Sequence, residues 1–201
     1  RFGTIGVHPS LLPKYRGVSP IQTAILNGDE KTGVSLYLMD EKIDHGEIVA
    51  SRKYQVLSND NYETLMKKLA ELEADLLIEF LRKLNQYSGS PTSQKLTANN
   101  IMEVGLPKIE LKPQNESLAT YTKKFKTEDA FIASEDLEKA QNDGGQIAVE
   151  IDRKIRALNP EPGVWTIKDG KRMKILEAEL MPDGKLKLKK IQFEGKKPVE
   201  I

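Results

Sequence analysis

The 201-residue sequence predicts an α/β region followed by a small, β-rich domain that forms a closed or half-closed barrel. Short apolar runs alternate with amphipathic helical patterns in the first part of the chain. A stretch rich in Ser, Thr, Asn, Pro and Lys then interrupts this periodicity, and beyond it strand-like runs are separated by turn residues. We therefore expect an α/β region at 1–88, a linker at 89–126 and a β-barrel domain at 127–201.

Three strands are expected in the α/β region. Residues 2–7 form an apolar run typical of a buried strand, and apolar residues alternate along 34–40. Residues 48–56 have the same character. Pro9 disfavours a helical conformation at His8, so the first strand leads into a loop. In open α/β sheets, ligands bind at loops that follow the carboxyl ends of strands.

Helix signals separate these strands. Ser19 followed by Pro20 is a favourable helix start, and Asn27-Gly28 is a favourable end. After Asp60, apolar residues recur every three or four positions as far as Leu84, which predicts the longest helix of the chain. A further apolar stripe predicts a helix over 146–158.

Turn residues and a change of phase indicate the barrel. Asp169-Gly170 predicts a hairpin, and Pro182 to Gly184 predicts another turn. In KLKLKKIQF the alternation of apolar residues slips by one at Lys189-Lys190, which predicts a β-bulge. Because bulges bend strands, these runs are expected to curl into a small barrel.

Composition excludes several classes of site. The chain has no cysteine and only two histidines, so a disulfide framework and a structural zinc site are excluded. There is no GxGxxG, no Walker A loop and no G-x-S-x-G motif. No apolar run is long enough to span a membrane, and no signal peptide is visible. We expect a cytoplasmic protein.

Charge is unevenly distributed. The net charge is +1, but residues 153–201 carry 13 Lys and Arg against 7 Asp and Glu. A basic region on an acidic body is typical of a protein with a polyanionic partner. A solvated, lysine-rich β surface without a partner would have the same composition. Charge alone does not distinguish such a surface from a region that binds a polyanion.

Both histidines follow predicted strands, where reactive side chains gather. If the strands are neighbours, Asp44 can meet His8, and a carboxylate beside an imidazole fixes its orientation and suits it to acid–base catalysis. A metal held by His8, Asp44 and His45 is a weaker alternative. Ser10 is better explained as part of a loop that lines a pocket than as a nucleophile.

Several motifs carry a resemblance. HPSLLPKYRGVSPIQTAILNGDEKTGVSLYLMDEKIDHGEI resembles the folate-dependent formyltransferases, with the SLLPKYRG loop and the I-D-x-G turn as its most specific parts. ATYTKK, IDRKIRALNPEPGVWTIKDG and KLKKIQFEGKKPVE resemble the C-terminal domain of the methionyl-tRNA formyltransferase family in order and spacing.

The resemblance implies the C-terminal half of a Rossmann-like catalytic domain and an OB-like, tRNA-binding barrel. It implies transfer of a formyl group from 10-formyltetrahydrofolate to initiator methionyl-tRNA, without a metal and by a monomer. Arg1 stands at the beginning without an initiator Met. We expect that an N-terminal portion of the catalytic domain precedes it.

The family's catalytic set is an Asn, a His two residues later and a distant Asp. His8 and Asp44 match the last two, whereas Gly6 occupies the Asn position. Losing one such hydrogen-bond donor costs about 3–4 kcal/mol, so a water, a backbone N–H or another side chain has to replace it, or the enzyme is slow. Ser10, Leu11, Leu12 and Pro13 match the loop that contacts folate.

Two alternatives stay open. An amino-sugar formyltransferase shares the SLLP loop, although the basic C-terminal region favours a nucleic acid. A catalytically impaired RNA-binding module would explain Gly6. For Arg16 two roles stay open, which are a contact with a tRNA phosphate and a structural role within its own loop. Candidate phosphate contacts in the C-terminal region are Arg153, Lys154, Arg156, Lys171, Arg172 and the lysines of 185–190.

Overall fold

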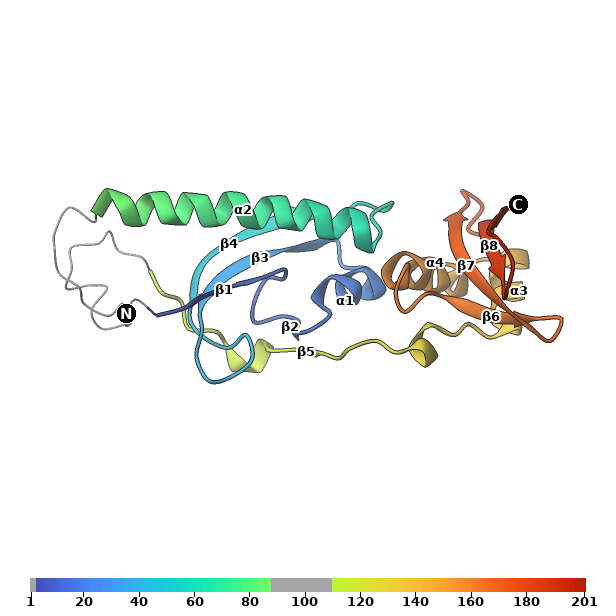
Figure 1. Ribbon diagram of the computed structural model, residues 1–201, viewed down its shortest axis with the longest axis horizontal. Helices are drawn as coiled ribbons and strands as arrows, with labels where there is room; N and C mark the ends of the chain where they lie inside the picture. Colours follow the sequence, from blue (N-terminus) through green and yellow to red (C-terminus); the bar gives the residue numbers. More distant parts are fainter. Residues whose placement is uncertain (1–2, 88–109) are drawn as a thin grey trace. The chain divides into compact units, whose positions relative to one another are not determined.

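The structure is a computed structural model that describes residues 3–87 and 110–201. The chain divides into two compact units, which are described separately (Figure 1). The first unit holds the N-terminal sheet and the long helix, and the second holds three helices and the C-terminal sheet. The first comprises Arg1–Pro20, Glu30–Leu57 and Thr64–Lys123, and the second comprises Ile21–Asp29, Ser58–Glu63 and Lys124–Ile201.

A three-stranded antiparallel sheet is the centre of the first unit. Its strands are β1 (Ile5–His8), β3 (Lys31–Leu38) and β4 (Ile48–Gln55), in the order β1-β3-β4. The three expected strands are confirmed, with shifted ends. His8 is the last residue of β1 and does not lie in the loop after it.

The register of β1 and β3 decides which side chains share a face. Gly6 is paired with Tyr37, and His8 with Ser35. Residues two apart on a strand point to the same face, and residues directly opposite each other on neighbouring strands do so too. All four residues therefore lie on one face of the sheet, and each is buried.

Helix α2 (Tyr62–Tyr87) runs alongside β4 (Figure 1). Arg52 pairs with Glu79 at 2.6 Å, and the Lys68 ammonium lies 5.7 Å from the centre of the Tyr54 ring. The apolar face of the helix is buried, as its periodicity predicts. Among the described residues, none of the helices, α2 included, combines the length and apolar character of a membrane span. The buried residues of this face are Leu65, Leu69, Leu76 and Phe80.

A later part of the chain returns to this sheet, and we call it the strap segment (residues 110–122). Lys112 forms an isolated bridge with Ile48. Strand β5 (Tyr121–Thr122) pairs in parallel with β2 (Arg16–Gly17), and the 3-10 helix η1 (Glu116–Leu118) lies between these two attachments. The strap segment therefore contacts the loop that follows His8.

The second unit contains three α-helices and a 3-10 turn, η2 (Thr127–Ala130). Helices α1 (Pro20–Asn27) and α4 (Gln146–Leu158) confirm the two helices expected there. Helix α3 (Ser134–Asn142) was not expected from the sequence. Its residues are mostly polar, and only Leu137 and Ala140 are buried, so no apolar stripe marks it.

The C-terminal sheet is antiparallel and has four strands in sequence order. They are β6 (Trp165–Lys168), β7 (Lys171–Leu180), β8 (Leu186–Phe193) and β9 (Val199–Glu200). Both predicted turns lie between these strands.

The predicted bulge is confirmed, whereas the predicted barrel closure is not. The partners of Leu188 and Lys190 are Ala178 and Glu177, which leaves Lys189 outside the register. Leu188 lies before the bulge and Ile191 lies after it, and both side chains are buried. Among the described strands β6 and β9 remain the two edges of an open sheet, so the C-terminal domain is a sheet domain without a closed barrel.

Candidate active site

His8 is buried at the end of β1, with 5% of its surface exposed. Its Nε2 lies 2.9 Å from the carbonyl oxygen of Tyr15. A carbonyl oxygen can only accept a hydrogen bond, so Nε2 carries a hydrogen. The other nitrogen, Nδ1, faces Asp44 Oδ2 at 3.5 Å. Nδ1 is therefore the nitrogen that is available to take up or release a proton.

Tyr15 is held in a conformation that is uncommon for an aromatic residue. Its φ of 64° lies in the left-handed region, which costs a bulky side chain on the order of 1–3 kcal/mol. The Tyr15 N–H donates to Thr120 Oγ1 at 2.8 Å, and its carbonyl accepts from His8. The strained backbone thus orients the histidine ring, with the strap segment as support.

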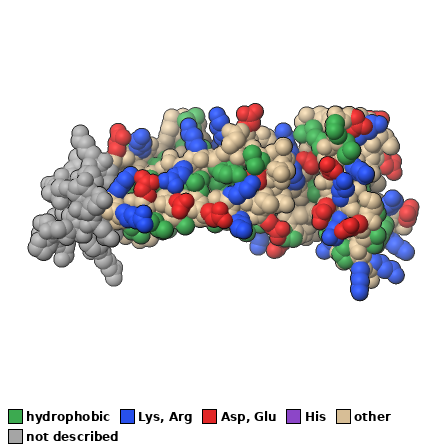
Figure 2. All heavy atoms as spheres, turned by 90° about the horizontal axis from the view of Figure 1, so that it is seen from above, with side chains coloured by type: hydrophobic (Ala, Val, Ile, Leu, Met, Phe, Trp, Pro, Cys, Tyr) green, Lys and Arg blue, Asp and Glu red, His purple; other side chains and the backbone are tan. Residues whose placement is uncertain are grey.

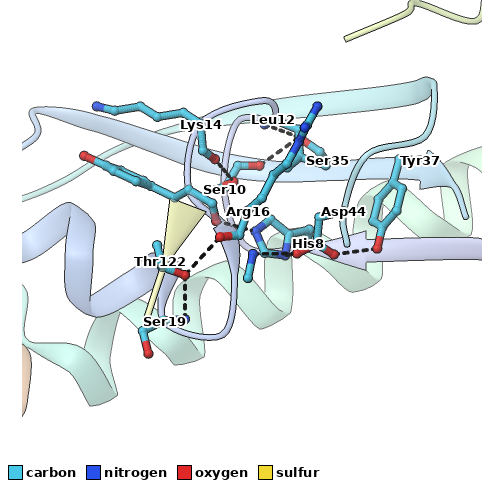
Figure 3. Close-up of polar contacts among 12 residues, drawn as sticks. His8, Ser10, Leu12, Lys14, Arg16, Ser19, Ser35, Tyr37, Asp44 and Thr122 are labelled. Atoms are coloured by element: carbon cyan, nitrogen blue, oxygen red, sulfur yellow. Dashed lines mark hydrogen bonds and ion pairs between the residues drawn. The ribbon is translucent and has the colours of Figure 1, made fainter. Parts of the chain in front are cut away.

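Asp44 is fixed through both carboxylate oxygens (Figure 3). The Tyr37 hydroxyl donates to Oδ1 at 2.6 Å, and the Gly17 N–H donates to Oδ2 at 2.7 Å. Asp44 also has a positive φ of 47°. In Figure 3 its carboxylate lies between His8 and Tyr37.

Tyr37 is a neutral hydrogen-bond donor at this site. Burial raises its pKa most, because it disfavours the phenolate, and the Asp44 carboxylate raises it further. Asp40 adds a smaller effect of the same sign. The hydroxyl therefore keeps its proton well above the ordinary pKa of tyrosine.

The strap segment supports the Asp44 loop from outside the sheet. The Gln114 side-chain amide donates to the carbonyl oxygens of Asp44 and Gly46, at 2.9 and 2.8 Å. Gly46 cannot be replaced there, because a Cβ would collide with the carbonyl group of Leu38. These bonds hold the backbone of Asp44 in its unusual conformation.

Arg16 connects the same segment to the loop after β1. Its side chain is fully buried and donates to Gln114, to Tyr121 and, through both terminal nitrogens, to Glu116. Of the two roles left open for Arg16, the structure supports the one within the loop, because the guanidinium is occupied by protein partners.

The loop of Ser10, Leu11, Leu12 and Pro13 is divided between buried and accessible side chains. The Ser10 hydroxyl donates to the Lys14 carbonyl at 2.5 Å. Ser35 Oγ accepts from the Leu12 N–H at 3.1 Å and donates to the Ser10 carbonyl at 2.7 Å. Ser10 and Leu12 are buried, whereas Leu11 and Pro13 are partly exposed. The last two are therefore the side chains that a ligand can reach.

The second histidine has different partners. His45 Nδ1 lies 2.5 Å from Asp40 Oδ2, and its Nε2 lies 3.4 Å from Glu116 Oε1. Within residues 3–87 and 110–201, His, Cys, Asp and Glu form no group of three that could hold a metal ion. His8 and Asp44 are thus brought together without His45 as a third ligand.

Three residues of the site are not evident from sequence patterns. Tyr37 lies inside a strand, Tyr15 acts through its carbonyl, and Gln114 is 70 positions from Asp44. Gly6 leaves room for Tyr37, but the two residues are brought together by the register of β1 and β3, which the sequence pattern does not give.

The arrangement can perform acid–base chemistry. A buried imidazole with one nitrogen occupied and the other facing a fixed carboxylate can receive a proton at Nδ1 while its ring stays oriented. The carboxylate stabilises the imidazolium that results. Such a pair suits attack by an amine, which has to lose a proton.

Comparison with known proteins identifies the same two parts. Residues 1–81 match the family model described as formyl transferase, and residues 145–185 match the model of the formyl transferase C-terminal domain. A methionyl-tRNA formyltransferase from Kosmotoga olearia is 34% identical over 99% of the chain and 62% of its own length. One from Carboxydothermus hydrogenoformans is 35% identical over 100% of the chain and 52% of its own length. The chain thus spans between half and two-thirds of these relatives.

Solved structures share the fold. Methionyl-tRNA formyltransferase from Clostridium thermocellum superposes with a TM-score of 0.63 at 24% identity, over 100% of the chain and 70% of that protein. HypX from Aquifex aeolicus in complex with tetrahydrofolic acid has a TM-score of 0.63 at 17% identity, over 98% of the chain and 33% of that protein. Both family models are matched in order and the relatives align along nearly the whole chain, so this α/β chain with its C-terminal sheet domain is similar to formyl transferases in both of its parts.

Proposed function

We propose that the protein transfers a formyl group from 10-formyltetrahydrofolate to the amino group of initiator methionyl-tRNA. The observation that carries this proposal is the buried His8, whose Nδ1 faces the fixed Asp44 carboxylate at 3.5 Å beside the Ser10–Pro13 loop. Relatives that are 34% and 35% identical along nearly the whole chain are methionyl-tRNA formyltransferases, which favours this substrate.

His8 and Asp44 would act as the catalytic residues. The amino group that attacks the formyl carbon becomes positively charged and has to release a proton. Nδ1 of His8 can accept that proton, because Nε2 already donates to Tyr15. Asp44 then faces a cation, and its attraction to the imidazolium lowers the barrier. The imidazolium can then give the proton to N10 of the folate as the bond between N10 and the formyl carbon breaks, so that tetrahydrofolate leaves.

The loop of residues 10–13 fits a folate that supplies the formyl group. Leu11 and Pro13 offer partly exposed apolar surface, as a flat heterocycle requires. Ser10 and Leu12 would act indirectly by holding the loop shape through Ser35. The proton-transfer steps assigned to His8 and Asp44 require no metal.

The basic C-terminal unit is the proposed tRNA contact. Lys154 is half-buried and donates to the Phe131 carbonyl, and Arg156 pairs with Asp152, so neither presents a fully exposed cation. Figure 2 shows other Lys and Arg side chains protruding from this unit, with acidic side chains among them. Among the phosphate contacts expected from the sequence, the side chains that are exposed are Lys171, Lys185 and Lys187.

The domain organisation that we propose keeps the boundaries expected from the sequence. Residues 1–88 would be the catalytic part, 89–126 the linker and 127–201 the tRNA-binding domain. The bulge at Lys189 bends β8, as in an OB-like barrel, which supports that finer fold for the C-terminal sheet. We further propose a monomer that acts in the cytoplasm and binds no membrane.

A substrate comparison tests the proposal. The natural full-length protein would be given labelled 10-formyltetrahydrofolate with initiator Met-tRNA, deacylated initiator tRNA or a nucleotide-linked amino sugar. We expect label on Met-tRNA and none on the other two. Label on the amino sugar alone would assign the protein to sugar formylation, and tRNA binding without any transfer would indicate the impaired RNA-binding module.

A further inference from the structure

Gly6 and Tyr37 compete for the same space. They are directly opposite each other in the β1–β3 ladder. A Cβ built on Gly6 would lie 2.5 Å from Tyr37 Cε1 and 2.8 Å from its hydroxyl oxygen. The nearest atoms all belong to Tyr37, so the tyrosine side chain fills the place that a side chain at position 6 would take.

The ring brings its hydroxyl to the catalytic carboxylate. The Tyr37 hydroxyl donates to Asp44 Oδ1 at 2.6 Å, while Oδ2 accepts from the Gly17 N–H and faces His8 Nδ1. A carboxylate with both oxygens fixed cannot rotate away from the imidazole. A phenylalanine would fill the same volume as Tyr37, but it would leave Oδ1 without this donor.

We propose that Tyr37 is a positioning residue of the active site, whose hydroxyl takes up the space left by Gly6 and holds the Asp44 carboxylate toward His8. The inference rests on the proposed formyl transfer and deepens it. It also explains how the chain tolerates Gly6, since the neighbouring strand supplies a polar group that fills this space and bonds Asp44. The role is indirect, because the hydroxyl proton is directed at Asp44.

Removing the hydroxyl tests this role. Tyr37→Phe in the natural full-length protein is expected to lower kcat for formyl transfer by about tenfold or more, as for loss of a hydrogen bond to a charged group. The KM values for both substrates should change by less than about twofold, because the Tyr37 hydroxyl is directed at Asp44. Tyr54→Phe, on strand β4 of the same sheet, is the matched control and should keep the wild-type kcat. A wild-type kcat in Tyr37→Phe would overturn the inference.

A double variant shows whether Tyr37 acts through Asp44. If it does, Tyr37→Phe should slow the Asp44→Asn protein by less than about twofold, because the group that it positions is already gone. Losses that multiply would mean that the two residues act independently, and the inference would be wrong.

A stability cycle separates this inference from the proposed function. Gly6 has no positive φ, and the three atoms nearest to an added Cβ all belong to Tyr37, so the main penalty of Gly6→Ala is expected to come from Tyr37. We expect Gly6→Ala to lower the Tm of the wild type and to lower that of Tyr37→Ala by clearly less. Equal shifts would contradict the shared space. A wild type that transfers no formyl group but shows the coupling would refute the proposed function and leave the Gly6–Tyr37 relationship standing.

Discussion

Gln114 donates hydrogen bonds to the backbone carbonyls of Asp44 and Gly46, at 2.9 and 2.8 Å, and so links the strap segment to the Asp44 loop. The two bonds secure a backbone whose φ at Asp44 is 47°. The position of the Asp44 carboxylate therefore depends on a residue that is distant in the sequence.

Replacing Gln114 should loosen that loop. Gln114→Ala removes these two neutral hydrogen bonds, worth roughly 1 kcal/mol each, and also the side-chain oxygen that accepts from Nε and Nη2 of the buried Arg16. We therefore expect the free energy of unfolding to fall by about 3–5 kcal/mol. Formyl transfer should slow because Asp44 no longer faces His8 in all molecules. Urea unfolding and kcat would be measured beside Gln55→Ala, an exposed glutamine on β4. Equal behaviour of the two variants would show that Gln114 does not support the loop.

The Arg16–Glu116 pair should make stability depend on pH. The Arg16 hydrogen bonds, opposed by burial, hold the pKa of Glu116 below its ordinary value. The stabilisation is complete above the ordinary glutamate pKa of about 4.3 and is lost as the pH falls through the lowered value. We expect the Tm difference between wild type and Glu116→Gln to shrink as the pH falls from about 6 to about 3. A difference that stays constant, or one matched by Glu110→Gln on the same segment, would contradict this assignment.

Tyr37 should produce a pH dependence at the alkaline end. Its pKa is raised by burial and by Asp44, so the folded protein holds the phenolic proton at a pH where the unfolded chain releases it. Stability should therefore fall as the pH rises above about 10, the ordinary tyrosine pKa. Urea unfolding at increasing pH should show a shallower fall for Tyr37→Phe. Asp44→Asn should give an intermediate slope, because burial is the larger cause and remains.

Binding of tRNA should weaken with salt in proportion to the phosphate contacts made. Lys171 and Lys187 are exposed on the C-terminal sheet, and Lys185 is exposed just before β8. Each alanine substitution that removes a phosphate contact should reduce the slope of log K against log salt by roughly 0.7–0.9. Filter binding of initiator tRNA over a range of salt concentrations measures this slope. Slopes that all three variants leave unchanged would place the tRNA elsewhere.

Periodicity predicts most regular elements because their burial follows a simple repeat. The helix over 146–158 and the long helix after Asp60 each bury one apolar stripe, and both are found. Helix α3 escapes prediction because Leu137 and Ala140 are its only buried residues. Closure of the barrel could not be decided, since a bulge bends a strand without determining its next neighbour.

The site was only partly predictable, for a related reason. His8 and Asp44 stand out because reactive residue types sit at strand ends. Tyr37 lies within a strand whose apolar pattern, Val34, Leu36 and Leu38, marks the opposite face. The pattern therefore does not identify Tyr37 as a site residue. Its role depends on the cross-strand register with Gly6, and register is a property of the folded sheet.

The most direct test of the account is the rate of formyl transfer to initiator Met-tRNA by the natural full-length protein and its histidine and aspartate variants. His8→Ala and Asp44→Asn should each lower kcat/KM by about a hundredfold or more, as for loss of a general base or of its partner. His45→Gln, which changes the other histidine, should stay close to wild type. Activity that survives His8→Ala and Asp44→Asn, or that is lost only in His45→Gln, would contradict the assignment of the His8–Asp44 pair as the catalytic centre.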